Sequence, residues 1–215
     1  MTTRIYLIRH GVTASNLEQR YMGRSEEPLS NDGRLQARRL ALRLADTELA
    51  ALYCSPLRRA QETAEIVAQP QALRPQMAAD FTEIDLSRWQ GLNAGEIAAR
   101  DAEAWRTWCV DPARLRLPGI ESFEELRQRV RRGIRALVKR HADSAVAVVT
   151  HDGVVRVAVL DSLETGLSLY RAIPTDNTGL TTLDFTPERT YLRALNDTGH
   201  LEHSLRHAAV GPGDR

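Results

Sequence analysis

The chain alternates short apolar runs with segments of helical periodicity. Strands covered on both faces are predicted by two nearly continuous apolar runs, 4–8 and 145–150. Three weaker runs also predict strands: 50–54, and the pair 180–185 and 190–195 that would form a hairpin. Helical spacing of apolar residues predicts helices over about 32–45, from 56 onward, and over 93–108, 121–140 and 154–163. Strands that alternate with helices indicate an α/β fold.

Turn and cap residues separate these elements without dividing the chain into domains. Ser30 is expected to cap the helix that follows it, and Ser55 with Pro56 to open the next one. Because no repeat, low-complexity block or linker is visible, we expect a single domain over 1–206. Within it, 84–119 predicts a small helical cap over the strand ends, and 207–215 a flexible tail.

Composition narrows the class of protein. The chain has 215 residues, 42% of them hydrophobic, and Lys+Arg (29) nearly balances Asp+Glu (28). This balance gives no support for nucleic-acid binding. The two cysteines are too few for a disulfide framework, which indicates a reduced protein. No apolar run approaches the roughly 20 residues that span a bilayer and no signal peptide is visible, so we expect a cytoplasmic protein without a membrane partner.

Two predicted strands end in a histidine followed closely by glycine. The first is followed by Arg9-His10-Gly11 and the most apolar one by His151-Asp152-Gly153. A single histidine at a strand end is more often structural, but ligands bind at the carboxyl ends of parallel strands. If the two strands are neighbours, both imidazoles face one crevice, and Arg9 lies beside them.

A third element brings more cations and a proton donor. Arg58 follows Ser55-Pro56 at a helix N-terminus, a place that favours anions, although an Arg-Arg pair is usually a solvated helix face. Arg9, Arg58 and His151 would then neutralise a phosphoryl group while His10 attacks phosphorus, with its pKa depressed by the guanidinium groups. Glu83, at the end of a strand-like or loop segment, is the candidate general acid; the alternative is an ordinary surface carboxylate.

The motifs together resemble the histidine phosphatase superfamily, also called the phosphoglycerate mutase-like fold. The resemblance rests on Arg9-His10-Gly11 with Thr13 and Asn16, on 23–33, on 55–60 with Thr63-Ala64, on Glu83 with Trp89 and Gly91, and on 149–153. It implies a three-layer α/β/α sandwich with a mostly parallel central sheet. It also implies a phosphohistidine on His10, a phosphate pocket of Arg9, Arg58 and His151, and Glu83 as proton donor. Asn16 and Gly23 would add substrate contacts, and no metal or other cofactor is implied.

The chain departs from the family pattern at two places. Leu86 stands where some phosphoserine-type members have a histidine, and Asp152 replaces the more usual glycine after the second histidine. The segment after Glu83 is shorter than in the mutases, which favours a phosphomonoester phosphatase acting on a small phosphorylated metabolite. Phosphoglycerate mutase-type transfer is the alternative.

Three further questions stay open at the level of sequence. The first is whether the chain is a catalytically inactive binding module on the same fold, which the retention of every expected catalytic position disfavours. Another is a metal site made of His200, His203 and His207, which no carboxylate or cysteine set completes. The third is the oligomeric state, for which a homodimer is an option.

Overall fold

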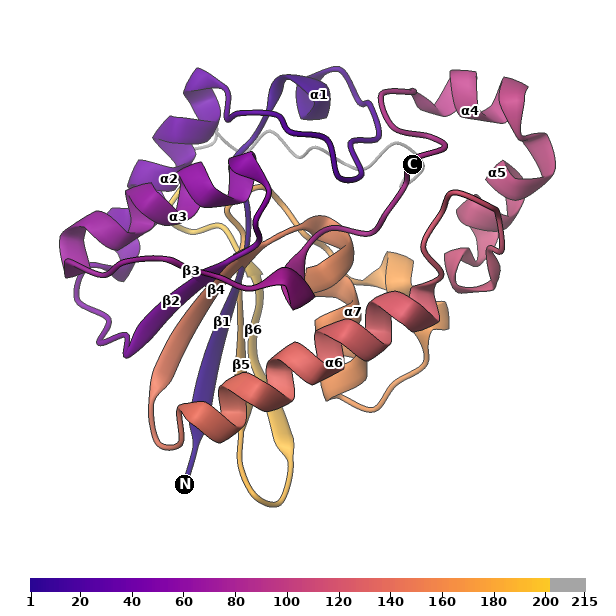
Figure 1. The fold of residues 1–215 in the computed structure, drawn as a ribbon. Helices are drawn as coiled ribbons and strands as arrows, with labels where there is room; N and C mark the ends of the chain where they lie inside the picture. Colours follow the sequence, from indigo (N-terminus) through magenta and orange to yellow (C-terminus); the bar gives the residue numbers. More distant parts are fainter. Residues whose placement is uncertain (202–215) are drawn as a thin grey trace.

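A computed structural model describes residues 1–201, in which a six-stranded mixed sheet forms the centre of the molecule (Figure 1). The strand order is β3-β2-β4-β1-β5-β6. The strands are β1 (Thr3–Arg9), β2 (Ala51–Cys54), β3 (Gln76–Met77), β4 (Ala145–Thr150), β5 (Leu180–Phe185) and β6 (Thr190–Asp197). The first four run parallel, while β5 pairs antiparallel with both β1 and β6. The predicted β5–β6 hairpin is confirmed.

Helices cover both faces of the sheet, as the alternation of side chains along β4 demands. Val146 and Val148 join the apolar cluster formed with α6 (Phe123–Arg140) and α7 (Asp152–Ser162). Ala147 and Val149 join the opposite cluster, formed with α2 (Asn31–Leu44) and α3 (Arg58–Ala68). Successive strand residues point to opposite faces, so a strand that is apolar throughout requires cover on both. The expected three-layer α/β/α sandwich is confirmed.

Local sequence signals account for several helix boundaries. The Ser30 side chain accepts a hydrogen bond from Gly33 N–H and caps α2, as predicted. Ser122 and Glu125 form a capping box at the start of α6, and a stripe of large apolar residues holds that helix against the sheet. The stripe consists of Phe123, Leu126, Val130, Ile134 and Leu137.

Two helical predictions need correction. α3 begins at Arg58 and its N-cap is Leu57, so Ser55 does not cap it. The predicted helix over 93–108 is two helices, α4 (Ala94–Arg100) and α5 (Ala102–Val110). The break lies at Asp101, whose φ of −137° leaves the helical region and whose carboxylate accepts hydrogen bonds from Arg88 and Trp89. These hydrogen bonds from another segment of the chain compensate for the intrahelical hydrogen bonds lost at the break.

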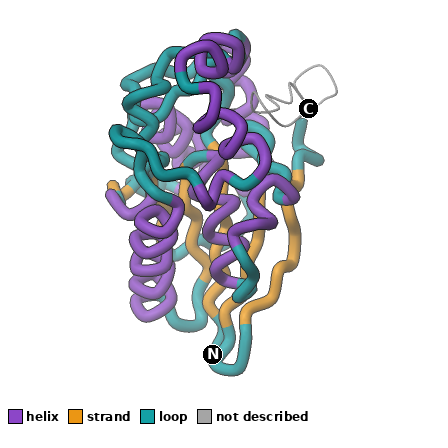
Figure 2. The backbone as a smooth tube through the Cα atoms, turned by 90° about the vertical axis from the view of Figure 1, so that its right-hand side faces the viewer, coloured by secondary structure: helices purple, strands orange, loops and turns teal. Residues whose placement is uncertain are grey.

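Loops and short helices gather at the carboxyl end of the parallel strands (Figure 2). That end carries the short helix α1 (Ala14–Leu17), and α4 and α5 lie beside it (Figure 1). Short 3₁₀ turns complete the connections, at Gln69–Gln71, Ala79–Phe81, Pro112–Arg114 and Leu167–Ala172. The division into one domain with a cap over 84–119 stays a prediction, and the predicted tail, 207–215, lies outside the described residues. No helix within 1–201 is long and apolar enough to cross a membrane.

Candidate active site

The ends of β1 and β4 bring the two predicted histidines together. The strands are hydrogen-bonded neighbours in register, with Arg9 opposite Thr150. As a result the rings of His10 and His151 lie with centroids 5.2 Å apart. Gly11 allows the chain to pass close to the start of α2, since a Cβ there would lie 2.5 Å from the Gly33 carbonyl oxygen.

The hydrogen bonds of His10 define which ring nitrogen is available. Nδ1 lies 2.7 Å from the Gly11 carbonyl oxygen, and Nε2 lies 3.2 Å from Arg59 Nε. A carbonyl can only accept and a guanidinium can only donate, so Nδ1 carries the proton and Nε2 the lone pair. Burial, with the charges of Arg59 and Arg9, places the pKa of His10 well below its usual value. The ring is therefore neutral, with a nucleophilic nitrogen beside a cation.

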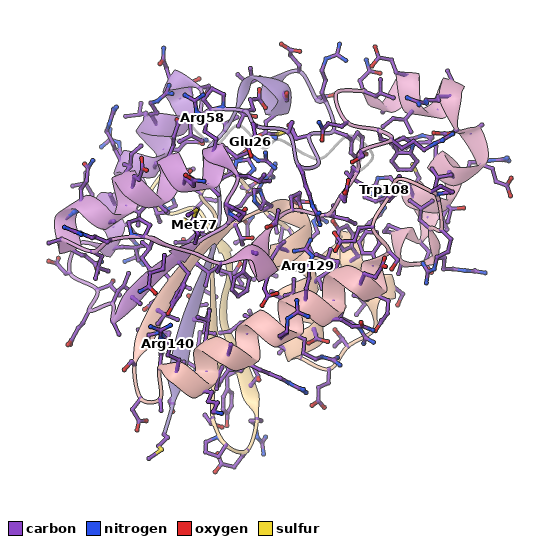
Figure 3. The ribbon with its side chains drawn as sticks, in the orientation of Figure 1. Glu26, Arg58, Met77, Trp108, Arg129 and Arg140 are labelled. Atoms are coloured by element: carbon purple, nitrogen blue, oxygen red, sulfur yellow. The ribbon has the colours of Figure 1, made fainter. Side chains whose placement is uncertain are left out.

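Arg59, rather than Arg58, is the arginine that α3 contributes to this site. Arg59 is 1% exposed and donates to His10 Nε2 and to the Ser25 and Gly23 carbonyl oxygens. The Arg58 side chain is 61% exposed and pairs with Glu62 one helical turn away. Figure 3 shows Arg58 beside Glu26, whose carboxylate accepts from the Arg58 backbone N–H at 3.1 Å. The prediction that Arg58 lies in the pocket is wrong.

The helical pattern held the signal that separates the two arginines. Consecutive helical residues lie about 100° apart, so a residue at the edge of the buried face can have an exposed neighbour. Arg58 begins a charged face that continues with Glu62 and Glu65. Arg59 begins the buried face, which continues with Ala60, Thr63, Ala64, Val67 and Ala68.

The remaining predicted contacts surround the same cavity. Arg9 is 6% exposed, and its Nη1 donates to the Thr175 carbonyl oxygen. Asn16 and Gly23 line the cavity with Arg9, His10 and Arg59.

Sequence reasoning missed Asn177, a buried loop residue that donates to the His10 carbonyl oxygen at 2.9 Å. Nothing in the sequence around Asn177 marks it.

His151 is completely buried and approaches Ser55, the residue that ends β2. Its Nε2 lies 2.7 Å from Ser55 Oγ. Burial, together with Arg59 and the neighbouring His10, keeps the pKa of His151 well below its usual value. Nδ1 is buried and has no hydrogen-bond partner among residues 1–201, which is unusual for a buried polar atom.

Glu83 is held at the pocket by its neighbours on both sides. Its carboxylate accepts from Ile84 N–H at 2.8 Å and from Gly153 N–H at 3.4 Å. Its carbonyl oxygen accepts from Arg129, which projects from α6 (Figure 3) and also donates to the Asp80 and Thr82 carbonyls. Burial, reinforced by the charge of Asp152, raises the pKa of Glu83. Such a carboxyl group is suited to donating a proton near neutral pH.

The cavity itself is small and has an apolar wall. Its volume is about 90 Å³, below the range typical of pockets for drug-sized ligands. Beyond the charged groups, its wall is formed by Tyr21, Met22, Ile84, Leu86, Trp108 and Tyr170. Three guanidinium groups (Arg9, Arg20 and Arg59), the neutral His10 imidazole and two carboxyl groups thus line a space that suits a small anion, and the His151 ring lies against that of His10.

The histidine cluster that the sequence analysis weighed as an alternative metal site is only partly within the described structure. His200 Nε2 lies 3.1 Å from Thr178 Oγ1, and His203 and His207 lie outside the described residues. In the part of the chain that the structure describes, no group of three or more His, Cys, Asp or Glu side chains is placed to hold a metal ion.

Comparison with known proteins identifies the family. A model of the histidine phosphatase superfamily (branch 1) matches residues 5–198. Phosphoserine phosphatase 1 of Hydrogenobacter thermophilus is 30% identical over 198 residues, covering 92% of this chain and 94% of that protein. A bifunctional protein of Mycobacterium tuberculosis is 33% identical over 93% of this chain, which spans only 55% of its length.

A solved structure shares the fold of this chain. The Bacillus stearothermophilus protein YhfR matches with a TM-score of 0.89 and 32% identity, over 93% of this chain and 100% of that one. The chain belongs to the histidine phosphatase superfamily, as its motifs indicated.

Proposed function

We propose that this protein is a phosphomonoester phosphatase that works through a phosphohistidine on His10, without a metal ion. The observation that carries the proposal is the fixed tautomer of His10, whose Nε2 lone pair faces Arg59 in an anion-sized pocket. Membership of the histidine phosphatase superfamily supports the same activity. The substrate is a small phosphorylated metabolite, and the cytoplasmic compartment stays a prediction.

Each proposed step follows from the chemistry of the groups around the pocket. A phosphoryl group takes over the hydrogen bond that Arg59 makes to His10, which frees the Nε2 lone pair. Nε2 attacks phosphorus as the ester P–O bond breaks, and Glu83 gives its proton to the departing alkoxide. Arg9, Arg59 and His151 Nδ1 stabilise the charge on the non-bridging oxygens.

The second half of the reaction restores the enzyme. Glu83, now a carboxylate, takes a proton from water as the water oxygen attacks phosphorus. The N–P bond breaks, inorganic phosphate forms, and the electron pair returns to His10 Nε2. Glu83 is protonated and His10 is neutral again, so both side chains have returned to their starting protonation states.

The experiment is to trap the intermediate on the protein. p-Nitrophenyl phosphate is mixed with the enzyme in the presence of EDTA, quenched in base, and the protein mass is measured. We expect one added phosphoryl group, stable in base and lost in acid, and absent from His10→Ala. A phosphoryl group that persists in His10→Ala would contradict the assignment.

A substrate panel then tests the kind of transfer. It contains phosphoserine, phosphoglycerates, sugar phosphates, nucleotides and α-ribazole phosphate, without added metal. Release of inorganic phosphate supports the phosphatase, whereas an isomerised phosphate ester would establish a mutase. No turnover of any member would favour an inactive binding module.

A further inference from the structure

Asp152 is a second carboxylate at the same pocket as Glu83. It is the first residue of α7, directly after His151, and its side chain is 28% exposed and lines the pocket. The next residue, Gly153, donates its N–H to Glu83, and a Cβ on Gly153 would lie 2.8 Å from Glu83 Oε1. The start of α7 therefore brings the two acids to one side of the pocket.

The two carboxyl groups have very different surroundings. Asp152 accepts from Arg156 Nε at 3.1 Å, lies 3.9 Å from Arg9 Nη1, and accepts from the Thr175 hydroxyl. Arg156 is itself fixed, since it donates to the Tyr170 carbonyl oxygen and stacks over the Tyr170 ring. Burial alone would raise the pKa of Asp152, but Arg156, Arg9 and Thr175 outweigh it and hold that pKa below its usual value.

Glu83 has no comparable set of cations on its carboxyl group. Arg24 and Arg129 bind its backbone carbonyl oxygen. Arg59 is the cation that lowers its pKa, while burial and the charge of Asp152 raise it. Titratable or charged groups reach the pocket from several elements. They are Arg9 at the end of β1, His10 directly after it, Arg20 and Tyr21 after α1, Arg59 from α3, His151 after β4, Asp152 from α7 and the hydroxyl of Tyr170.

We propose that Asp152 is a positioning residue for catalysis: it stays ionised on Arg156 and Arg9, and its charge keeps the proton of this acid pair on Glu83. Two carboxylates that share one site cannot both ionise easily, and the one with the better cation partners loses its proton first. The inference rests on the proposed function in giving Glu83 the role of proton donor. It adds the reason why Glu83 carries the proton.

The direct test measures the protonation of Glu83 in Asp152→Asn, which removes the charge at constant size. Carboxyl ¹³C NMR titrations are recorded for the wild type and the variant, with the Glu83 signal assigned by its loss in Glu83→Gln. We expect the titration of Glu83 to move at least half a pH unit toward acid in Asp152→Asn. This measurement needs no substrate, so it holds even if the protein hydrolyses nothing.

The kinetic test follows kcat/KM against pH for the alkyl phosphate that the wild type hydrolyses best. The alkaline limb should move toward acid in Asp152→Asn by the same amount, since the limb reports the acid form of the pair. Glu188→Gln, which neutralises an exposed acid in the β5–β6 turn, is the matched control and should leave the limb in place. Asp152→Ser is the second variant, should Asp152→Asn fail to fold.

Two results would overturn the inference and leave standing the proposal of a phosphatase that works through a phosphohistidine on His10. One is a fall in kcat/KM of Asp152→Asn by the same factor at every pH, with the alkaline limb of the pH profile unmoved. This result would make the role of Asp152 merely structural. The other is loss of alkyl phosphate turnover with p-nitrophenyl phosphate spared, which would make Asp152 itself the donor. Failure of the wild type to hydrolyse any phosphomonoester would instead refute the proposed function, and the NMR titration would still decide the inference.

Discussion

Replacing Arg58 and Arg59 by alanine, one at a time, tests which of these adjacent arginines belongs to the pocket and which to the protein surface. Arg59 is buried, donates to His10 Nε2, and binds the Gly23 and Ser25 carbonyl oxygens at 2.8 and 2.7 Å. Its burial lowers its pKa to about 10, so it stays charged at neutral pH. Arg58, one residue earlier, points to solvent and pairs with Glu62. The structure therefore predicts very different effects for the two variants.

The expected magnitudes follow from these positions. Removing a preorganised donor to a developing oxyanion costs about 2.7–4 kcal/mol, so Arg59→Ala should lower kcat/KM about 100- to 1,000-fold. Arg58→Ala removes an exposed i,i+4 ion pair worth about 0.5 kcal/mol or less of stability and should leave kcat/KM nearly unchanged. Arg59→Lys keeps the positive charge but loses the guanidinium fork that reaches His10 and two carbonyl oxygens together. Its kcat/KM should therefore lie between those of Arg58→Ala and Arg59→Ala.

The assay is hydrolysis of p-nitrophenyl phosphate at pH 7, with calorimetric Tm recorded for each variant. Arg59→Ala also leaves two carbonyl oxygens without their donor, at about 1–3 kcal/mol each, so activity is compared well below its Tm. A loss above tenfold in Arg58→Ala, or equal losses in both alanine variants, would refute the assignment of Arg59 to the pocket.

Three further changes test other parts of the structure. Glu83→Gln should reduce kcat/KM far more for alkyl phosphates than for p-nitrophenyl phosphate, whose leaving group needs little protonation; equal losses would argue against a proton donor. Gly153→Ala places a methyl group 2.8 Å from Glu83 Oε1 and should lower alkyl phosphate kcat/KM about 10- to 100-fold with little change in Tm. Asp184 pairs with Arg4 and Arg193, and the Arg4 hydrogen bond, despite the cost of burial, lowers its pKa. Its stabilisation is present above about pH 4 and lost as pH falls further, so Asp184→Ala should cost about 1–2 kcal/mol of unfolding free energy at pH 7 and much less at pH 3 by urea titration. An equal loss at both pH values would contradict the ionic role.

The layers of the fold and the strand ends that carry chemistry could be predicted from the sequence alone. The nearly unbroken apolar run over 145–150 demands cover on both faces, and β4 has it. Because His10 and His151 each follow such a strand, their meeting needed only that the strands be parallel neighbours. Periodicity and strand ends are local properties, which is why single segments of the chain reveal them.

The placement of Arg59 in the pocket and the different surroundings of Glu83 and Asp152 depend on the tertiary structure. Arg58 and Arg59 differ by one step of rotation about α3, and the start of that helix depends on how β2 ends and how the chain turns after it. The roles of Glu83 and Asp152 depend on cations that are distant in sequence or lie on another face of the pocket. Charge interactions act through space between segments brought together by packing, so no local pattern encodes them.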